Sequence, residues 1–553
     1  MVNFFLLPAM YFLGKKVQPE KQDEIMKKYD VIVIGGGLGG LTAGAKLAKE
    51  GKKVLLIEQH TVPGGYATTF RRKDFLVEAG LHEMDGLDPD DAKLPILKEL
   101  GVLEHLDFVE VPEFYRFKSS RTDIVVPANT DEAVRVLVAA FPAEKKGIEA
   151  FFRTIHAISR EIRRLPLEQW KTKLQMPFFP LLYPHLAVAT SKAAAVLFPL
   201  FALLHPSLLF GRYDTVGNFV DSIIRNEELK LLLLANFPYY HDDPYALSLI
   251  YFSVAQSSYY RGGGHFIKGG SQKLSDYLAR YITTHGGEVL LGRLVTKILT
   301  ENGKAVGVVH RKTRGGEPDE ESVFAETVIA NAAVPNVEKM LPDKESALLR
   351  SKTANLQHSC SILNLFLGFK REVSALNNRA YSTFVVDGSV KTLKDAAANV
   401  HADFSTRGFA FVDYSQIDSG LAPAGKSFGS LCTTDYLSDW EGLDKEQYRA
   451  KKDMVAQILI GRLEKLIPGI REEIEYYEMG TAKTLQRYTL NPGGVIYGYA
   501  QLPRQSGLLY RTPNRSPVEN LYFASAWSNP GGGFTGAILG GWFCALELLR
   551  KQA

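Results

Sequence analysis

The chain has 553 residues, 46% of them apolar, with 65 basic and 61 acidic residues and a formal net charge of +4. A chain of this length is expected to fold into two or three lobes. The apolar content excludes a disordered chain, and the balanced charge gives no reason to expect nucleic acid as a partner. Cys360, Cys432 and Cys544 form no metal-binding or disulfide pattern, so we expect three buried free cysteines and no metal site.

Two stretches are unusually apolar. Residues 2–13 are too few to span a bilayer and lack the features of a signal peptide, so they are either an interfacial anchor or an arm packed on the body. Residues 174–211 carry one charged residue, Lys192, and five prolines, which preclude one straight helix. We expect short helices that contact one leaflet or line an apolar channel, with a buried core as the alternative. Both stretches suggest a peripheral, monotopic protein on the cytoplasmic side of a membrane.

The pattern from residue 29 to residue 60 is strand, glycine turn, helix, strand. Residues 29–34 and 54–57 are short apolar runs, and residues 38–50 place apolar or small side chains at helical spacing. Gly51 stands where a helix C-terminal cap belongs. Buried strands joined by a helix are typical of a parallel sheet, and therefore of an α/β lobe.

The turn after the first strand contains the motif GxGxxG. Gly35 allows a tight turn, Gly37 allows the backbone to approach a pyrophosphate, and Gly40 allows close packing of the helix on the strand. Phosphates would then lie at the helix N-terminus, where free N–H groups favour negative charge. Glu58 ends the second strand, where a carboxylate can accept the hydroxyls of an adenosine ribose. The whole pattern predicts a dinucleotide site.

Further elements follow in chain order. The pattern predicts a helix over 271–284, strands over 288–300 and 304–312, a hairpin tip at 314–317 and a return strand over 322–329. A long helix is expected near 451–466 and a last helix over 536–549. Glycine-rich, strand-rich pieces thus lie at the start, middle and end of the chain. One nucleotide-binding lobe built from three separated segments would explain this.

A second glycine pair, Gly64-Gly65, follows Glu58 and can bring backbone against the far end of a long cofactor, which favours FAD over NAD. Around it the sequence resembles the carotenoid desaturase, carotenoid isomerase and retinol saturase family of amine-oxidase-like flavoproteins. The segments that carry the resemblance are 31–44, 58–70, 78–82 and 521–541, together with 262–289 and 520–542, which are similar to the family's middle and C-terminal blocks. Residues 64–86 are most similar to the retinol saturase and carotenoid isomerase branch.

The resemblance implies a Rossmann-type FAD-binding lobe in three segments and an α+β substrate-binding lobe. The apolar segment 174–211 would belong to the second lobe, as helices that either contact a membrane or line an apolar channel. The implied divisions are an arm or anchor at 1–28, FAD-binding parts at 29–115, 256–340 and 516–553, a substrate or lid domain at 116–255 and a substrate domain at 341–515.

The resemblance also assigns residues to the cofactor. Residues 531–535 should line the flavin ring and ribityl chain, the backbone of Val295 should contact the adenine end, and Asn331 should mark the return of the chain to the cofactor lobe. Many relatives have Gly-Asp where this chain has Ser525-Ala526, so Ser525 or Ser528 either replaces that carboxylate or leaves its role unfilled. The expected cofactor-binding residues are Gly35, Gly37, Leu38, Gly39, Gly40, Glu58, Gly64, Gly65, Tyr66, Val295, Asn331, Ser528, Gly532, Gly533, Phe534 and Thr535.

Three more residues invite a functional interpretation. His82 would lie near the flavin, and its ordinary pKa near neutrality suits a proton donor, although a structural histidine is the alternative. Tyr497 and Tyr499 line a substrate tunnel or pack in the core.

The function implied is an FAD-dependent oxidoreductase that saturates or desaturates carbon–carbon bonds of a long apolar polyene or isoprenoid, such as a carotenoid or retinoid. Alternatives are a redox-neutral cis–trans isomerase that uses reduced FAD, a non-catalytic isoprenoid carrier and an amine oxidase. No second GxGxxG lies in a βαβ unit, so the electron donor or acceptor is left open among free reductants, quinones, a partner protein and transiently bound nicotinamide.

Overall fold

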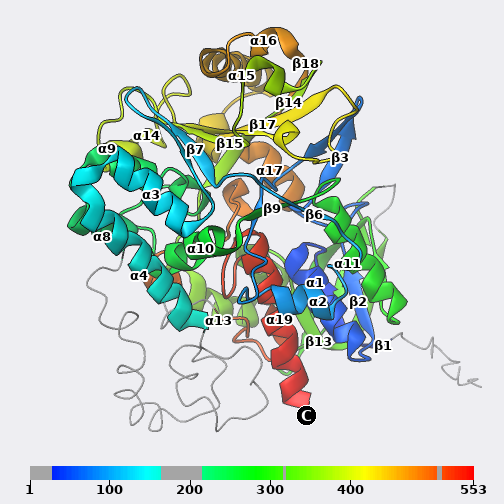
Figure 1. Cartoon of the computed structure of the whole chain (residues 1–553). Helices are drawn as coiled ribbons and strands as arrows, with labels where there is room; N and C mark the ends of the chain where they lie inside the picture. The colour runs from blue at the N-terminus through cyan, green and yellow to red at the C-terminus, as the bar shows by residue number, and fades with distance from the viewer. Residues whose placement is uncertain (1–27, 164–214, 315–318, 507–512, 553) are drawn as a thin grey trace, which may run out of the picture.

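The computed structural model describes residues 28–163, 215–314, 319–506 and 513–552 (Figure 1). The apolar stretches at 2–13 and 174–211 lie outside the described residues. None of the described helices is both long and apolar enough to cross a bilayer. The described helices are α1 (Leu38–Lys49), α2 (Leu94–Glu99), α3 (Thr130–Ala140), α4 (Lys145–Arg163), α8 (Val216–Ile223), α9 (Glu227–Leu233), α10 (Leu249–Gly262), α11 (Gln272–Thr284), α12 (Val334–Met340), α13 (Asp343–Thr353), α14 (Leu393–Asn399), α15 (Lys445–Leu466), α16 (Ile470–Glu473), α17 (Ala482–Thr489), α18 (Pro503–Ser506) and α19 (Gly533–Gln552).

The first large sheet has the strand order β10-β2-β1-β13-β12-β11, with β19 paired to β13. The pairs β1–β2, β1–β13, β2–β10 and β13–β19 are parallel, whereas β11, β12 and β13 form an antiparallel meander. Its strands come from three separated parts of the chain: β1 (Lys28–Ile34) and β2 (Val54–Ile57), then β10 (Glu288–Leu290), β11 (Arg293–Glu301), β12 (Lys304–Lys312) and β13 (Glu320–Ala330), and finally β19 (Leu521–Phe523).

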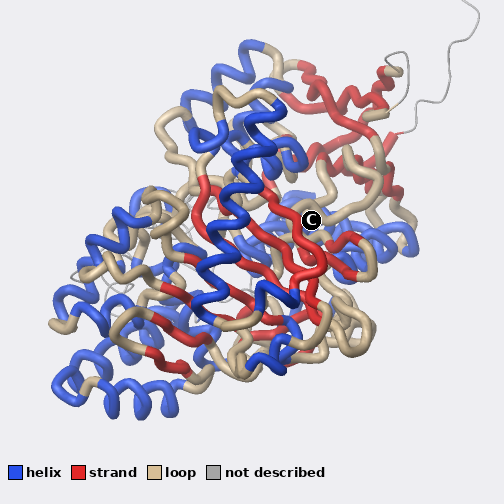
Figure 2. Tube along the Cα trace, turned by 90° about the horizontal axis from the view of Figure 1, so that it is seen from above, coloured by secondary structure: helices blue, strands red, loops and turns tan. Residues whose placement is uncertain are grey.

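The second large sheet has the order β18-β14-β17-β16-β15-β7-β8. Helix α15 covers one face of it, because Val455, Leu459 and Leu463 pack in one core with the strand residues Leu365 and Leu431. Figure 2 shows this helical layer above the strands. The strands are β7 (Tyr115–Lys118), β8 (Asp123–Val126), β14 (Ser361–Phe369), β15 (Ser382–Val385), β16 (Phe409–Asp413), β17 (Ser427–Asp435) and β18 (Ile474–Gly480).

Two small sheets lie between these layers. One is the hairpin of β3 (Thr69–Arg72) and β4 (Phe75–Glu78), and in the other β9 (Gly264–Ile267) pairs with β5 (Met84–Asp85) and β6 (Phe108–Glu110). Because β5 and β9 are far apart in sequence, this small sheet fixes the early chain against the segment that follows α10.

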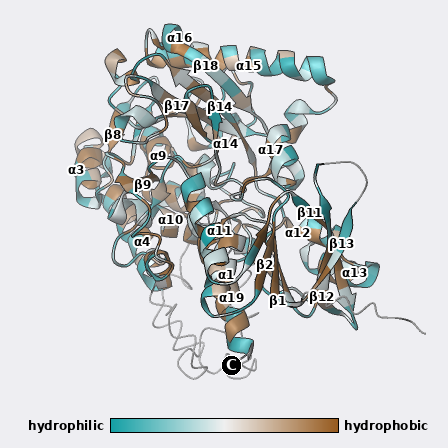
Figure 3. Ribbon diagram, turned by 90° about the vertical axis from the view of Figure 1, so that its right-hand side faces the viewer, coloured by the Kyte–Doolittle hydropathy of each residue, from teal (hydrophilic) through white to brown (hydrophobic). Residues whose placement is uncertain are grey.

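Helices α1 and α19 lie side by side next to the first sheet, in which β1 and β2 are strongly apolar (Figure 3). They approach closely because both are rich in glycine. A Cβ atom on Gly541 of α19 would lie 2.1 Å from the carbonyl oxygen of Gly39 in α1. The first and the last glycine-rich segments of the chain are therefore packed against each other.

Three predicted boundaries were wrong. Strand 288–300 is broken into β10 and β11 at Gly292, which adopts a φ of +69°. The long helix begins earlier, at Lys445, because Asp444 and Gln447 form a capping box. The last helix begins at Gly533, since its glycine-rich first turn carries little helix propensity that sequence could reveal. The prediction of three buried free cysteines is confirmed.

Candidate cofactor and substrate site

The glycine turn after β1 is shaped by its own protein neighbours. Cβ atoms on Gly35 and Gly37 would lie 2.5 Å from the carbonyl oxygen and 2.8 Å from the side-chain nitrogen of Asn331, and one on Gly39 would lie 1.6 Å from the carbonyl oxygen of Ala524. Asn331 also donates from Nδ2 to the carbonyl of Gly35 at 3.1 Å. Asn331 and the end of β19 therefore support the turn from behind, a contact that the motif did not reveal.

The N-terminus of α1 is open to an anion. Gly37 is the N-cap residue, no side chain caps the helix, and its first turn contains no acidic residue. The free N–H groups and the positive end of the helix dipole thus face the space in front of the turn. This is the arrangement that binds a phosphate in dinucleotide folds.

Glu58 is held in place at the end of β2. Its Oε2 accepts from the N–H of Gly36 at 2.6 Å and its Oε1 from the N–H of His60 at 2.8 Å. The buried carboxylate lines the cavity and keeps lone pairs for a ligand. Arg293 and Val295 of β11 lie in the same part of the wall.

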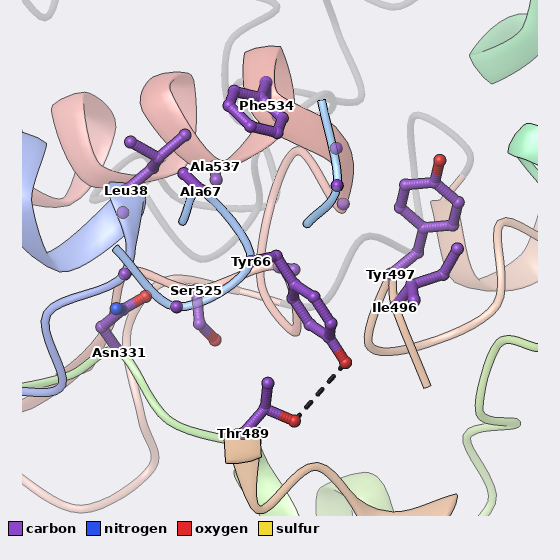
Figure 4. Close-up of a pocket in the computed structure, with 18 of the residues that line it drawn as sticks. Leu38, Tyr66, Ala67, Asn331, Thr489, Ile496, Tyr497, Ser525, Phe534 and Ala537 are labelled. Atoms are coloured by element: carbon purple, nitrogen blue, oxygen red, sulfur yellow. Dashed lines mark hydrogen bonds between the residues drawn. The ribbon is translucent and has the colours of Figure 1, made fainter. Parts of the chain in front are cut away.

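A cavity of about 520 Å³ extends from this turn to the region between the two large sheets. The labelled residues in Figure 4 come from α1, the loop after β2, the turn after β13, the end of α17 and the loop after it, the loop after β19 and the start of α19. Of the predicted cofactor residues, those that line the cavity are Gly35, Gly37, Leu38, Gly39, Glu58, Gly64, Gly65, Tyr66, Val295, Asn331, Gly532, Gly533, Phe534 and Thr535.

Gly40 and Ser528 do not line the cavity. Gly40 packs behind the turn, where a Cβ would lie 2.3 Å from the carbonyl oxygen of Gly35. Ser528 is buried and donates to the carbonyl of Ser525 at 3.0 Å, so it turns away from any ligand, whereas Ser525 itself lies in the wall. Of the two serines considered as substitutes for the family's carboxylate, only Ser525 faces the cavity.

The second glycine pair joins the first. The N–H of Gly64 donates to the carbonyl of Gly36 at 2.7 Å, and Gly64 and Gly65 adopt φ values of +131° and +62°. Both conformations favour glycine. The next residue, Tyr66, donates from its hydroxyl to the carbonyl of Val495 at 2.9 Å and lies 3.4 Å from Thr489 (Figure 4). This links the cofactor side to the loop after α17.

The first turn of α19 forms the far wall of the cofactor region. A Cβ on Gly532 would lie 2.4 Å from the ring of Tyr497, so Gly532 is required by this packing. The hydroxyl of Thr535 donates to the carboxylate of Asp85 on β5. Tyr251 of α10 donates to the carbonyl of Gly532 at 3.1 Å.

A buried ion cluster supports Asp85. The fully buried Lys93 ammonium lies 2.5 Å from Asp91 and 3.6 Å from Asp85. Burial by itself would raise the pKa of Asp85, but Lys93 and the Thr535 hydroxyl outweigh this and lower it below its ordinary value. Asp85 is therefore ionised, and Lys93 balances its charge. Through Thr535 it anchors the start of α19.

The other end of the cavity is a chamber with an aromatic wall. Its tyrosines are Tyr239, Tyr240, Tyr251, Tyr259 and Tyr497. Four of them come from the helical region before residue 260, in which no motif marked them. Burial, the largest cause, raises the pKa of the Tyr239, Tyr240, Tyr259 and Tyr497 hydroxyls well above 10, so they stay protonated.

Tyr497 and Tyr499 differ in position: one lines the cavity and the other packs in the core. Tyr497 lines the cavity. Tyr499 packs in the core beside the first sheet, with its ring 4.9 Å from that of Trp527.

His82 lines the chamber, and its Nδ1 lies 2.7 Å from the hydroxyl of Tyr239. Burial lowers its pKa to about 4. The imidazole is therefore neutral at neutral pH, and the argument from a near-neutral pKa was wrong because it ignored desolvation. The adjacent Glu83, which sequence reasoning missed, carries a carboxyl in the same wall.

The sequence pattern of the family described as flavin containing amine oxidoreductase matches residues 38–549. The chain belongs to this family. The match begins at α1, directly after the glycine turn, and ends within α19, so it includes the second large sheet, all strands of the first sheet except β1, and the first turn of the last helix.

Two groups of curated relatives cover nearly the whole chain. Prolycopene isomerase from Daucus carota is 27% identical over 98% of this chain and 83% of its own length. All-trans-retinol 13,14-reductase from Danio rerio is 26% identical over 95% of this chain and 86% of its own length.

Solved structures share the fold. Putrescine oxidase aligns with a TM-score of 0.59 at 15% identity over 95% of this chain and 99% of its own. An oxidoreductase from Methanosarcina mazei aligns with a TM-score of 0.57 at 18% identity over 94% of this chain and 99% of its own. A Rossmann-type lobe joined to a substrate lobe is thus the architecture of this chain.

The site fits FAD, the cofactor of this family. The uncapped α1 N-terminus suits a pyrophosphate, the Glu58 carboxylate suits a ribose, and Gly532 and Gly533 in the cavity wall present backbone rather than side chains to a flat ring. No cluster of three potential metal ligands occurs within the described residues.

Proposed function

We propose that this protein is an FAD-dependent enzyme that saturates or desaturates carbon–carbon bonds of a long apolar polyene or isoprenoid, such as a carotenoid or retinoid. One observation carries the proposal: a single cavity joins the dinucleotide turn to an apolar, aromatic chamber. A long conjugated chain fits such walls, since it offers apolar surface and no charge.

The bound flavin would supply reversible hydride transfer to or from a substrate carbon. The protein's own residues hold the polyene against the Gly532 region and exclude water. No side chain is needed as a nucleophile. Burial raises the pKa of Cys432, the cysteine in the cavity wall, to about 12, which keeps it a protonated thiol.

Redox-neutral cis–trans isomerisation with reduced FAD is the second candidate. It is supported by the prolycopene isomerases, which match this chain at about the same identity as the retinol reductase. Both candidates use the same cavity. Saturation or desaturation transfers electrons between flavin and substrate, whereas isomerisation involves no net transfer.

The mass of the product tests both candidates. The purified full chain with FAD is incubated without oxygen with a panel of polyenes, in parallel with oxidised and with photoreduced cofactor, and protein stripped of flavin is the control. A gain of two hydrogens means saturation, a loss of two means desaturation, and an unchanged mass with altered absorbance means isomerisation. No conversion of any polyene by flavin-loaded protein would contradict the proposal.

We also propose peripheral contact with the cytoplasmic side of a membrane, because a polyene substrate is stored in bilayers and residues 2–13 and 174–211 are strongly apolar. Co-flotation of the full chain with phospholipid vesicles tests this. A chain that stays entirely with the unbound fraction at every lipid concentration contradicts it. The electron donor is left open.

A further inference from the structure

Glu83 is the unusual residue of the chamber. It precedes β5, and its stem packs beside Gly264 of β9, where an added Cβ would lie 3.1 Å from its Cγ. Its Oε2 is buried without a hydrogen-bond partner, although Glu83 lines the cavity. An unpaired carboxyl oxygen in an apolar wall is costly unless the group is neutral or meets a ligand.

Glu83 interacts electrostatically with several other titratable groups. Those that respond to its charge are Tyr239, Tyr240, Tyr259, Tyr381, Tyr414, Tyr497 and Cys432, and Glu113 acts on Glu83 in turn. Tyr497 also contacts Gly532, at the start of the last helix. Glu83 therefore lines the same cavity as Tyr497, the residue that packs against Gly532 beside the cofactor region.

The groups of the chamber differ sharply as acids. Burial, aided by the nearby Glu113, raises the pKa of Glu83 to about 8, so that it is protonated at neutral pH. The tyrosines and Cys432 hold their protons far more tightly, His82 is already neutral, and Asp85 is ionised beside Lys93. Among these cavity-lining groups, Glu83 is the one that both carries a proton at pH 7 and can release it readily.

We propose that Glu83 is the catalytic acid that delivers a proton to the polyene during saturation. The inference rests on the proposed function. Saturation adds a hydride, with its electron pair, from reduced flavin to one carbon of a double bond, and the neighbouring carbon takes the proton from the Glu83 carboxyl. One π bond is lost, two C–H bonds form, the flavin is oxidised and the glutamate becomes a carboxylate that water reprotonates.

The test compares Glu83→Gln with the wild type and with Glu301→Gln, an exposed position at the end of β11. We expect kcat for saturation by reduced holoenzyme to fall by about 100-fold or more in Glu83→Gln, with little change in KM. Glu83→Asp keeps an acid and should recover part of the rate. In the wild type kcat should fall as pH rises through about 8, and this limb should be absent from the residual activity of Glu83→Gln.

A second measurement needs no turnover. The infrared difference between wild-type and Glu83→Gln holoenzyme should contain the band of a protonated carboxylic acid at pH 7, and this band should disappear with a midpoint near pH 8. An ionised Glu83 at pH 7, or an unchanged kcat and pH profile in Glu83→Gln, overturns the assignment. If the wild type converts no polyene, the proposed function fails, whereas the infrared titration still decides whether Glu83 holds the proton.

Discussion

Glu58 uses both carboxylate oxygens to organise backbone. It joins the glycine turn at Gly36 to the loop at His60, and its position at the end of β2 also exposes it to the cavity. A single acidic side chain thus shapes the turn, and we expect it also to accept the ribose hydroxyls of the cofactor.

The substitution Glu58→Gln should weaken FAD binding by about 10- to 100-fold, because charge-assisted hydrogen bonds contribute about 1.5–3 kcal/mol. Titration of stripped protein with FAD, followed by flavin fluorescence, measures the dissociation constant. The exposed Glu301→Gln variant serves as the control and should bind as the wild type does. Equal affinity in Glu58→Gln would show that the carboxylate does not contact the cofactor.

At the scale of elements, the crossing of α1 and α19 brings the first and last parts of the cofactor lobe together. The contact depends on Gly541, because the position of its Cβ atom is occupied by the backbone carbonyl of Gly39. Alanine is ordinarily the better helix former, by about 1 kcal/mol. At this crossing the lack of space outweighs propensity.

We therefore expect Gly541→Ala to lower the free energy of unfolding by about 1–3 kcal/mol. Gly388→Ala is the matched control, since its added Cβ would lie 3.8 Å from the nearest atom, Ser120 Cβ, and its effect should stay within about 0.5 kcal/mol. Chemical unfolding of the flavin-loaded proteins measures both. A Gly541→Ala variant as stable as the control would mean that the helices separate without cost.

At the scale of the whole molecule, the cavity is built by elements of both lobes. Glu58 and Asn331 come from the first sheet, Cys432 comes from the second, and Tyr251 comes from the helices beside them. A ligand in this cavity therefore touches both lobes, which also share one hydrophobic core.

Removal of FAD should lower the stability of the entire chain rather than of one lobe. At a cofactor concentration 100 times the dissociation constant, binding contributes about 2.7 kcal/mol, and we expect the midpoint of thermal unfolding to fall by about 2–5 °C in stripped protein. Scanning calorimetry with and without added FAD measures the shift. A midpoint that does not depend on the FAD concentration would contradict cofactor binding in this cavity.

The sequence by itself determined the dinucleotide end. Gly35, Gly37 and Glu58 belong to one short pattern of strand, glycine turn, helix and strand, which the sequence shows directly, although Asn331, which packs against the turn, lies far along the chain. The same reasoning placed residues 531–535 near the cofactor only through family resemblance, and it misjudged Ser528, whose direction depends on how the chain turns before α19.

Only the tertiary structure decided the substrate end. Glu83, Tyr239 and Tyr259 come from separate segments without a common spacing, and their chemistry depends on burial, which no local pattern records. Burial also reversed the expectation at His82, whose pKa falls to about 4. Local geometry can be read from neighbouring residues, whereas desolvation arises from every segment that packs around a group.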